Sequence, residues 1–194
     1  MSAAVPPESS IPPESSTPPE SAPPPEPPEP DAPGDPEAVA RIICLRLLDR
    51  RARTRSELET ALRAKGVPDD AARTVLDRFT EVGLVDDRAL ADGYALAQHR
   101  ERGLAGRAVA MKLRQRGIDE PTVQDALGQI DRESELETAR ALVARRMRSL
   151  SGLAPEVRAR RLVGLLARKG YPPGLAHQVV RETVRELELD ALDD

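Results

Sequence analysis

The sequence predicts an all-α fold of three tandem three-helix repeats, which form an elongated array behind a disordered proline-rich tail. Three observations favour this fold. Apolar residues recur at helical spacing from residue 37 onward, and runs of β-branched residues with period two are absent there. A Leu-x-x-Lys/Arg-Gly element also occurs three times, and self-similarity at a spacing of about 50 residues is typical of repeat proteins.

The N-terminal segment differs from the rest of the chain. Residues 1–36 contain 14 of the 19 prolines and seven acidic residues, with neither Lys nor Arg. Their few apolar side chains cannot offset the entropy lost on ordering, so we expect a disordered acidic tail with polyproline II bias. The last residues, 190–194, are predicted to form an acidic terminus outside the repeats.

Beyond residue 36 the pattern predicts nine helices. They fall at 37–51, 55–65, 69–82, 87–102, 106–116, 120–129, 132–149, 155–169 and 173–189. Aligning Gly66, Gly117 and Gly170 groups these helices in threes. The predicted repeats therefore span residues 37–82, 83–130 and 131–189.

Several helix ends carry local signals. Thr54 and Glu57 fit a capping box, although Ser56 and Glu59 fit one as well, so this start stays open by two residues. Gly83 is expected to adopt the left-handed conformation that ends a helix. Asp86 then suits the N-cap of the next helix, and Asp87 complements the dipole of that helix.

Charge is distributed unevenly along the chain. The net charge of −4 hides a basic body, because residues 37–181 contain 28 basic and 20 acidic side chains. A basic body favours a polyanionic partner such as nucleic acid. Arg has also replaced Lys almost everywhere, since only three Lys are present, and this is typical of solvated arginine-covered helices. On charge alone both interpretations stay open.

Residues that carry chemistry are scarce. The single Cys44 excludes a disulfide framework and is expected to be a buried small hydrophobe. His99 and His177 lie in different repeats without carboxylates at ligand spacing, so we expect solvated or partly packed histidines. With no phosphate loop and no nucleophile–base pair, we predict no catalytic residue, no metal site, no cofactor and no enzymatic activity. The absence of a signal peptide and of a long apolar run predicts a soluble, cytoplasmic protein without membrane contact, and we expect a monomer.

Arginines at helix ends and turns are the remaining functional candidates, because guanidinium groups there can reach phosphates or carboxylates bidentately. Further arginine clusters lie at 145–148 and 158–161. The candidate partner or DNA contacts are Arg51, Arg53, Arg55, Arg100, Arg102, Arg107, Arg114 and Arg116, and the structural positions are Gly66, Gly83, Asp86, Asp87, Gly117 and Gly170.

The motifs together resemble a known family. The segments 44–58 (CLRLLDRRARTRSEL), 62–66 (LRAKG), 75–87 (VLDRFTEVGLVDD) and 111–118 (MKLRQRGI) are similar to those of the RecX regulatory proteins, and the match covers about 40–187. The resemblance implies tandem three-helix repeats, binding to the RecA recombinase and to its single-stranded DNA filament, and inhibition of RecA ATPase and strand exchange. It also implies a role in recombination, DNA repair and the SOS response, and weak sequence-independent DNA binding.

Two features depart from the family pattern. The family favours an aromatic residue where Leu90 stands, and aromatic-rich stretches in the fourth helix, where only Tyr94 remains. The proline-rich tail lies outside the resemblance. The alternative function is a stand-alone DNA-binding regulator of the helix-turn-helix type, and a third is a helical scaffold for unrelated proteins.

Overall fold

The computed structural model describes residues 34–190, with side chains as far as Glu186. The predictions for most of the proline-rich tail and for the acidic terminus lie outside the described residues. Within that range the chain is entirely helical, without strands, and each predicted helix is confirmed to within two residues at either end. The elements are α1 (Pro36–Arg50), α2 (Arg55–Ala64), α3 (Asp69–Glu81), α4 (Asp87–Arg102), α5 (Gly106–Gln115), α6 (Glu120–Leu127), α7 (Arg132–Met147), the 3-10 turn η1 (Arg148–Leu150), α8 (Pro155–Arg168) and α9 (Pro173–Asp190).

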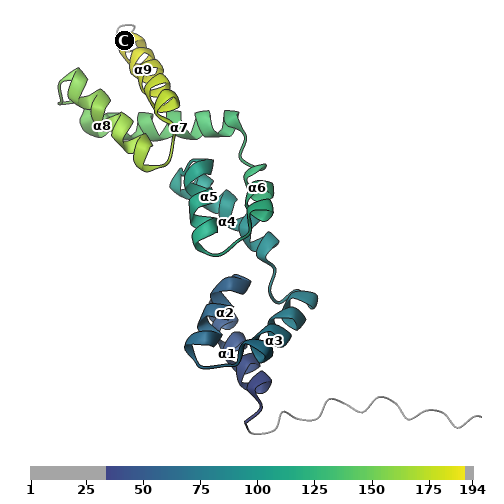
Figure 1. Ribbon diagram of the computed structural model, residues 1–194. Coiled ribbons are helices and arrows are strands. Elements are labelled where there is room, and N and C mark those ends of the chain that lie inside the picture. The colour runs from purple at the N-terminus through teal and green to yellow at the C-terminus, as the bar shows by residue number, and fades with distance from the viewer. Residues whose placement is uncertain (1–33, 191–194) are drawn as a thin grey trace, which may run out of the picture.

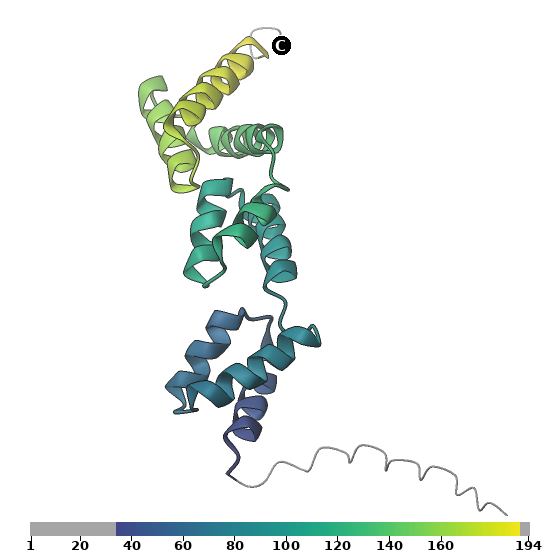
Figure 2. The same cartoon turned by 45° about the vertical axis from the view of Figure 1, so that its right-hand side comes forward.

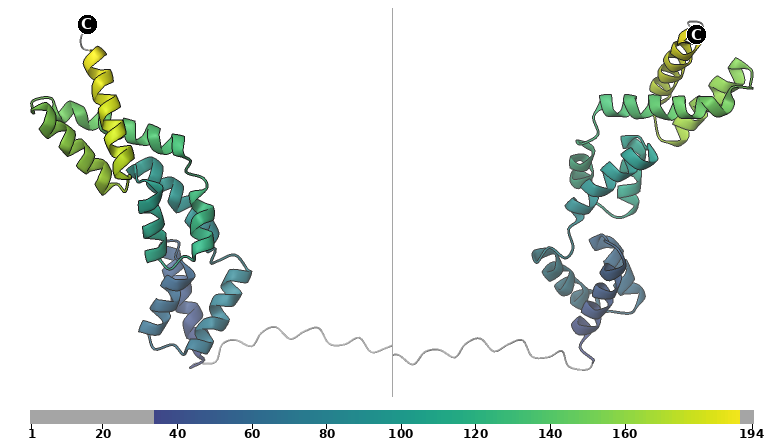
Figure 3. Two further views of the ribbon diagram at one scale, coloured as in Figure 1. Left: turned by 45° about the horizontal axis from the view of Figure 1, so that its top comes forward. Right: turned by 180° about the vertical axis from the view of Figure 1, so that it is seen from behind.

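The helices form three units that follow one another in a row (Figure 1). Repeat 1 is α1–α3, repeat 2 is α4–α6 and repeat 3 is α7–α9, and every strong helix–helix contact lies within one repeat. In the views of Figures 2 and 3, α7 crosses the end of repeat 2, and the turn between α8 and α9 reaches past α7 towards repeat 2. The predicted elongated array is therefore confirmed.

Each repeat has its own hydrophobic core. Leu58, Leu62 and Leu76 are completely or almost completely buried in repeat 1, Val109 and Leu113 in repeat 2, and Leu162 and Leu166 in repeat 3. The middle helix of every repeat supplies two of these side chains at i and i+4, which places both on one face. Burial of that face stabilises each three-helix unit.

The same turn ends the middle helix of every repeat. Gly66, Gly117 and Gly170 all have positive φ angles, of 76°, 78° and 92°. The N–H of the residue after each glycine bonds a carbonyl in the preceding helical turn, for example Ile118 N to Leu113 O at 3.2 Å. This is the hydrogen bonding of a glycine-terminated helix, so the repeated Lys/Arg-Gly element is a helix stop.

The predicted start of α4 is also confirmed. Gly83 has a φ of 73°, and the Asp86 carboxylate accepts the Ala89 N–H at 2.8 Å as an N-cap. Val85, just before the cap, is 2 % exposed and packs in the core of repeat 1. The segment from Gly83 to Asp86 joins repeats 1 and 2, and it is held by the core of repeat 1 at Val85 and by the N-cap of α4 at Asp86.

Candidate partner-binding surface

The contact between repeats 1 and 2, called here the first joint, is polar. The Thr54 hydroxyl donates to the Arg116 carbonyl at 2.7 Å, and the Arg55 N–H donates to Asp87 Oδ1 at 2.9 Å. Thr54 also forms the predicted capping box with Glu57, which selects the earlier of the two possible starts for α2. The residues that cap α2 and α4 therefore also hold two repeats together.

Arg116 lies at the centre of the first joint. Its guanidinium donates to both Glu57 oxygens, at 2.9 and 3.2 Å, and lies 5.3 Å from the centre of the Tyr94 ring. The Arg116 and Glu57 side chains are only 17 % and 20 % exposed. A bidentate, largely desolvated pair with an aromatic face beside it is stronger than a surface ion pair.

Two carboxyl groups of the first joint have shifted pKa values. Burial raises the pKa of Glu57, but hydrogen bonds from Arg116 and Thr54 and the charges of Arg116 and Arg51 outweigh it and lower the pKa overall. For Asp87, burial is the largest cause and the pKa is raised, although the Arg55 N–H opposes it. The joint therefore holds Glu57 in the ionised form required by its arginine partner.

The contact between repeats 2 and 3, the second joint, uses backbone atoms. The Ala105 N–H donates to the Lys169 carbonyl at 3.0 Å, and the buried Tyr171 hydroxyl donates to the Gly103 carbonyl at 3.3 Å. The Gly106 N–H donates to Glu135 Oε1 at 2.6 Å. Ala105 packs within the core of repeat 3, so the apolar core continues across this joint.

His99 also belongs to the second joint, and the expectation of a solvated or partly packed ring was wrong for it. The side chain is 3 % exposed. Nδ1 lies 2.8 Å from the Leu104 carbonyl, while Nε2 lies 2.9 Å from Ser134 Oγ and 3.1 Å from Thr138 Oγ1 of α7. Packing of α7 across α4 removes the ring from solvent and supplies these partners. His177 is exposed, and Cys44 is fully buried as expected, with a pKa that burial raises to about 11.

The two joints share one geometry. In each, the N-terminal end of a middle helix meets the glycine turn of the next repeat: Thr54 contacts the Arg116–Gly117 turn, and Ala105 contacts the Lys169–Gly170 turn. Equivalent positions thus make equivalent contacts, and a repeated contact of this kind produces a linear array.

The structure separates the eight predicted contact arginines into two groups. Four form ion pairs within the chain. Arg51 and Arg116 pair with Glu57, Arg55 pairs with Asp77, and Arg114 pairs with Glu120. The remaining four, Arg53, Arg100, Arg102 and Arg107, make no ion pair within residues 34–190, and of these only Arg53 is half-buried. The prediction that all eight bind a partner stays a prediction.

A second set of arginines, outside the eight predicted contacts, surrounds hollows on repeat 3. One hollow of about 610 Å³ between α7 and α8 is lined by Arg146, Arg160, Arg161, Gly164, Leu165 and Arg168. The helical spacing of the arginines on α8 could have indicated this basic surface from the sequence. The contribution of Arg146 from α7 depends on tertiary packing.

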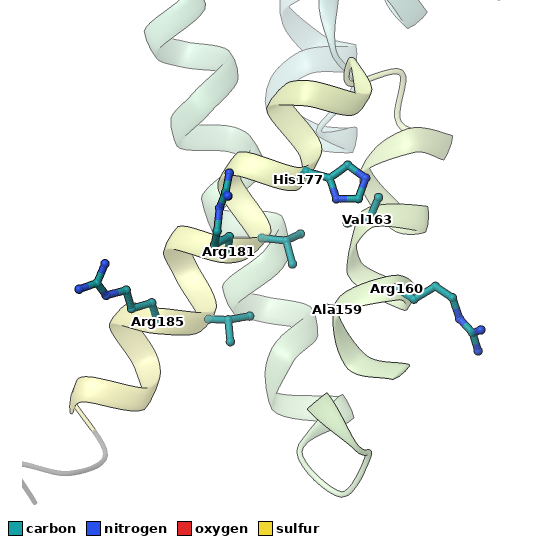
Figure 4. Close-up of a pocket in the computed structure, with 8 residues that line it drawn as sticks. Ala159, Arg160, Val163, His177, Arg181 and Arg185 are labelled. Atoms are coloured by element: carbon teal, nitrogen blue, oxygen red, sulfur yellow. The ribbon is translucent and has the colours of Figure 1, made fainter. Parts of the chain in front are cut away.

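A groove between α8 and α9, also of about 610 Å³, adjoins that hollow through Arg160 (Figure 4). Val163, Val180 and Val184 line its floor, while His177, Arg181 and Arg185 line its α9 side. In the close-up, the Arg160 side chain extends away from α9, and Arg185 extends to the opposite side. The groove thus has an apolar floor and basic edges.

Other kinds of site are not evident in the described part of the chain. Residues 34–190 contain no group of three or more His, Cys, Asp or Glu side chains that could hold a metal ion. Over the same residues, no helix combines the length and hydropathy needed to cross a membrane.

Comparison with known proteins assigns the family. Models of the first, second and third three-helix domains of RecX match residues 40–79, 86–127 and 133–180. The chain belongs to the RecX family. Each matched segment falls within one repeat of the structure.

Relatives and solved structures support this assignment. The chain is 51 % identical to the regulatory protein RecX of Thermobifida fusca over 80 % of its own length and 83 % of the relative. It is 50 % identical to that of Streptomyces coelicolor over 76 % and 78 %. The crystal structure of RecX from Lactobacillus salivarius, 20 % identical, shares the fold with a TM-score of 0.68 over 80 % of this chain and 98 % of the other.

Proposed function

We propose that this chain binds the RecA recombinase and its filament on single-stranded DNA, and that it inhibits RecA ATPase, recombination and DNA-repair activity. Membership of the RecX family supports a RecA-related role. The observation that carries the proposal further is the row of three joined repeats with unpaired arginines on repeats 2 and 3. An extended array presents a long surface, which suits a filament better than a compact partner.

The arginines divide the proposed contacts into two classes. Arg100, Arg102 and Arg107 are exposed and unpaired, so they bind partner carboxylates or phosphates directly. Arg51, Arg55, Arg114 and Arg116 already have carboxylate partners and bind only by exchanging them. Arg53 is half-buried, and its Nε has no hydrogen-bond partner within the described residues.

RecA ATPase on single-stranded DNA, measured while the full chain is titrated, tests this function. We expect inhibition at amounts well below that of RecA, because an elongated array offers a long surface to a filament. The triple substitution R100E/R102E/R107E should abolish inhibition. The matched reversal R50E/R73E/R78E on repeat 1, outside the proposed contacts, should leave it unchanged.

No inhibition even at equimolar protein would contradict the proposal. Sequence-dependent binding to duplex DNA without RecA would instead favour the stand-alone DNA-binding regulator. We also propose that the protein is a cytoplasmic monomer. Light scattering after gel filtration tests the mass, and fractionation of cells tests the location.

A further inference from the structure

The hollow between α7 and α8 is almost entirely basic. Four of its six lining residues are arginines, and no carboxylate lines it. Arg168 also lines a hollow at the second joint, together with Arg107 and Arg114. We call Arg146, Arg160, Arg161 and Arg168, with Gly164 and Leu165 beneath them, the arginine track.

The sequence of α8 explains how one helix supplies most of this surface. Arg161, Gly164, Leu165 and Arg168 are spaced i, i+3, i+4 and i+7, and so form one stripe. Leu162 and Leu166 form the buried stripe and fix α8 in the core. Packing of α7 against α8 then places Arg146 on the opposite wall of the hollow.

Folding of the chain does not explain why four arginines gather in the track. Arg146, Arg160, Arg161 and Arg168 are all exposed, and none makes an ion pair within residues 34–190. Four neighbouring like charges repel one another, and Gly164 in the middle of a helix is less favourable than alanine. Both features oppose stability, and an external anion would offset them.

We propose that the arginine track binds the phosphodiester backbone of nucleic acid without reading its sequence. Arg161 and Arg168 lie two helical turns, or about 10 Å, apart along α8, so they can reach different phosphates of one strand. Guanidinium groups bind phosphate oxygens bidentately. No aromatic residue lines the track, so bases find no surface on which to stack.

The charge of the track favours nucleic acid over an acidic peptide. Gly164 and Leu165 are the only lining residues without a charge. The apolar groove lies on the other side of Arg160, between α8 and α9. A hollow with four guanidinium groups and no carboxylate suits a ligand that carries a negative charge at every unit. This site adds a nucleic-acid contact to the proposed function. It rests on that function only for the statement that the bound strand is the DNA of the filament.

The experiment measures binding of the full chain to a fluorescein-labelled 30-nucleotide oligo(dT) by anisotropy, without RecA, from 50 to 200 mM NaCl. The track variant is R146A/R161A/R168A. The control variant R50A/R78A/R132A removes three exposed arginines outside the track and changes the net charge equally. Circular dichroism at 222 nm verifies that both variants are folded.

We expect the track variant to bind at least tenfold more weakly at 50 mM NaCl. The slope of log affinity against log salt should become shallower by about 2, since each lost phosphate contact contributes about 0.7 on a single strand. The control should stay within twofold of the parent chain. Replacing oligo(dT) by a mixed sequence should change affinity by less than twofold.

An equal loss in both variants would overturn the proposal, because net charge alone would then explain binding. Unchanged binding by the track variant would overturn it too, as would a labelled poly-glutamate peptide that binds the parent chain as tightly as oligo(dT). These outcomes leave the proposed function separately testable, because RecA ATPase is measured in a different assay with a different set of substituted arginines.

Discussion

The first and second joints place equivalent elements together but hold them by different chemistry. The first depends on side chains, with Arg116 paired to Glu57 beside Tyr94. The second depends on backbone hydrogen bonds, such as Ala105 to Lys169, and on a core that continues from one repeat into the next. The same architecture can therefore be joined by an arginine–carboxylate pair at one end, and by backbone hydrogen bonds and a shared core at the other.

This difference predicts different mechanical behaviour along the array. Ion pairs weaken with salt and with acid, whereas buried backbone hydrogen bonds and apolar contacts do not. Repeats 2 and 3 should therefore behave as one body, while repeat 1 is attached through a contact that solution conditions can loosen.

The glycine turns allow the largest test of the two joints. A methyl group at Gly170 would lie 2.6 Å from Ala108 Cβ and 3.1 Å from Ala108 N, whereas at Gly66, outside both joints, nothing lies within 4 Å. Since both glycines have positive φ, Gly66→Ala should cost about 1 kcal/mol for strain alone, and Gly170→Ala about 2–4 kcal/mol. Urea denaturation measures both.

Gly117→Ala should cost at least as much as Gly170→Ala. There the added methyl group would overlap Ser56 Oγ, which can rotate away, and Ser56 Cβ, which the backbone holds in place. An equal cost for Gly66→Ala and Gly170→Ala would mean that the second joint does not resist expansion at this turn and is not closely packed there.

His99 provides the next largest effect. His99→Leu should destabilise the protein by about 2–3 kcal/mol, because the Leu104 carbonyl loses its buried partner and two hydroxyl groups of α7 lose theirs. His177→Leu, at an exposed histidine, is the matched control and should change the free energy of unfolding by less than about 0.5 kcal/mol. Similar losses of stability for both variants would show that His99 does not stabilise the second joint.

Glu57 gives the first joint a pH dependence. Its pKa in the folded protein is below the ordinary value of 4.5, so its stabilisation is complete above that value and is lost as pH falls through the folded pKa. Glu57→Gln should therefore be less stable than the parent chain at pH 7 by about 1–3 kcal/mol, and the difference should shrink towards pH 3.

Denaturation of both chains across pH 3–7 measures this difference. Glu59→Gln removes a surface pair with Arg63 and is the control, with an expected change below about 0.5 kcal/mol. A Glu57→Gln difference that stays constant across the pH range would show that the charge of Glu57 is not what joins repeats 1 and 2.

Helix ends could be predicted because their signals are local. The Thr54–Glu57 capping box, the Asp86 cap and the three Lys/Arg-Gly turns each lie within a few residues of the boundary that they set. Periodic leucines likewise identified the buried faces of α2, α5 and α8. The repeat itself followed from the spacing of the glycines.

The joints could not be predicted because their partners are distant in sequence. Arg116 and Glu57 are separated by 59 positions, and Thr54 bonds a carbonyl 62 positions away. Arg116 therefore looked like a partner contact, although most of its hydrogen-bonding capacity is used within the chain. Arg146 likewise joins the α8 arginines only through the packing of α7, which no local pattern indicates.

Two tyrosines provide the smallest and most direct comparison of the joints. The buried Tyr171 hydroxyl donates across the second joint to Gly103 O, so Tyr171→Phe should cost about 1 kcal/mol. The Tyr94 ring supports Arg116 in the first joint through its face, and its hydroxyl makes no hydrogen bond within residues 34–190. Tyr94→Phe should therefore change stability by less than about 0.3 kcal/mol, since phenylalanine keeps the aromatic face. Urea denaturation at pH 7 resolves the difference, and a larger loss for Tyr94→Phe than for Tyr171→Phe would reverse the assignment of polar and aromatic contacts to the two joints.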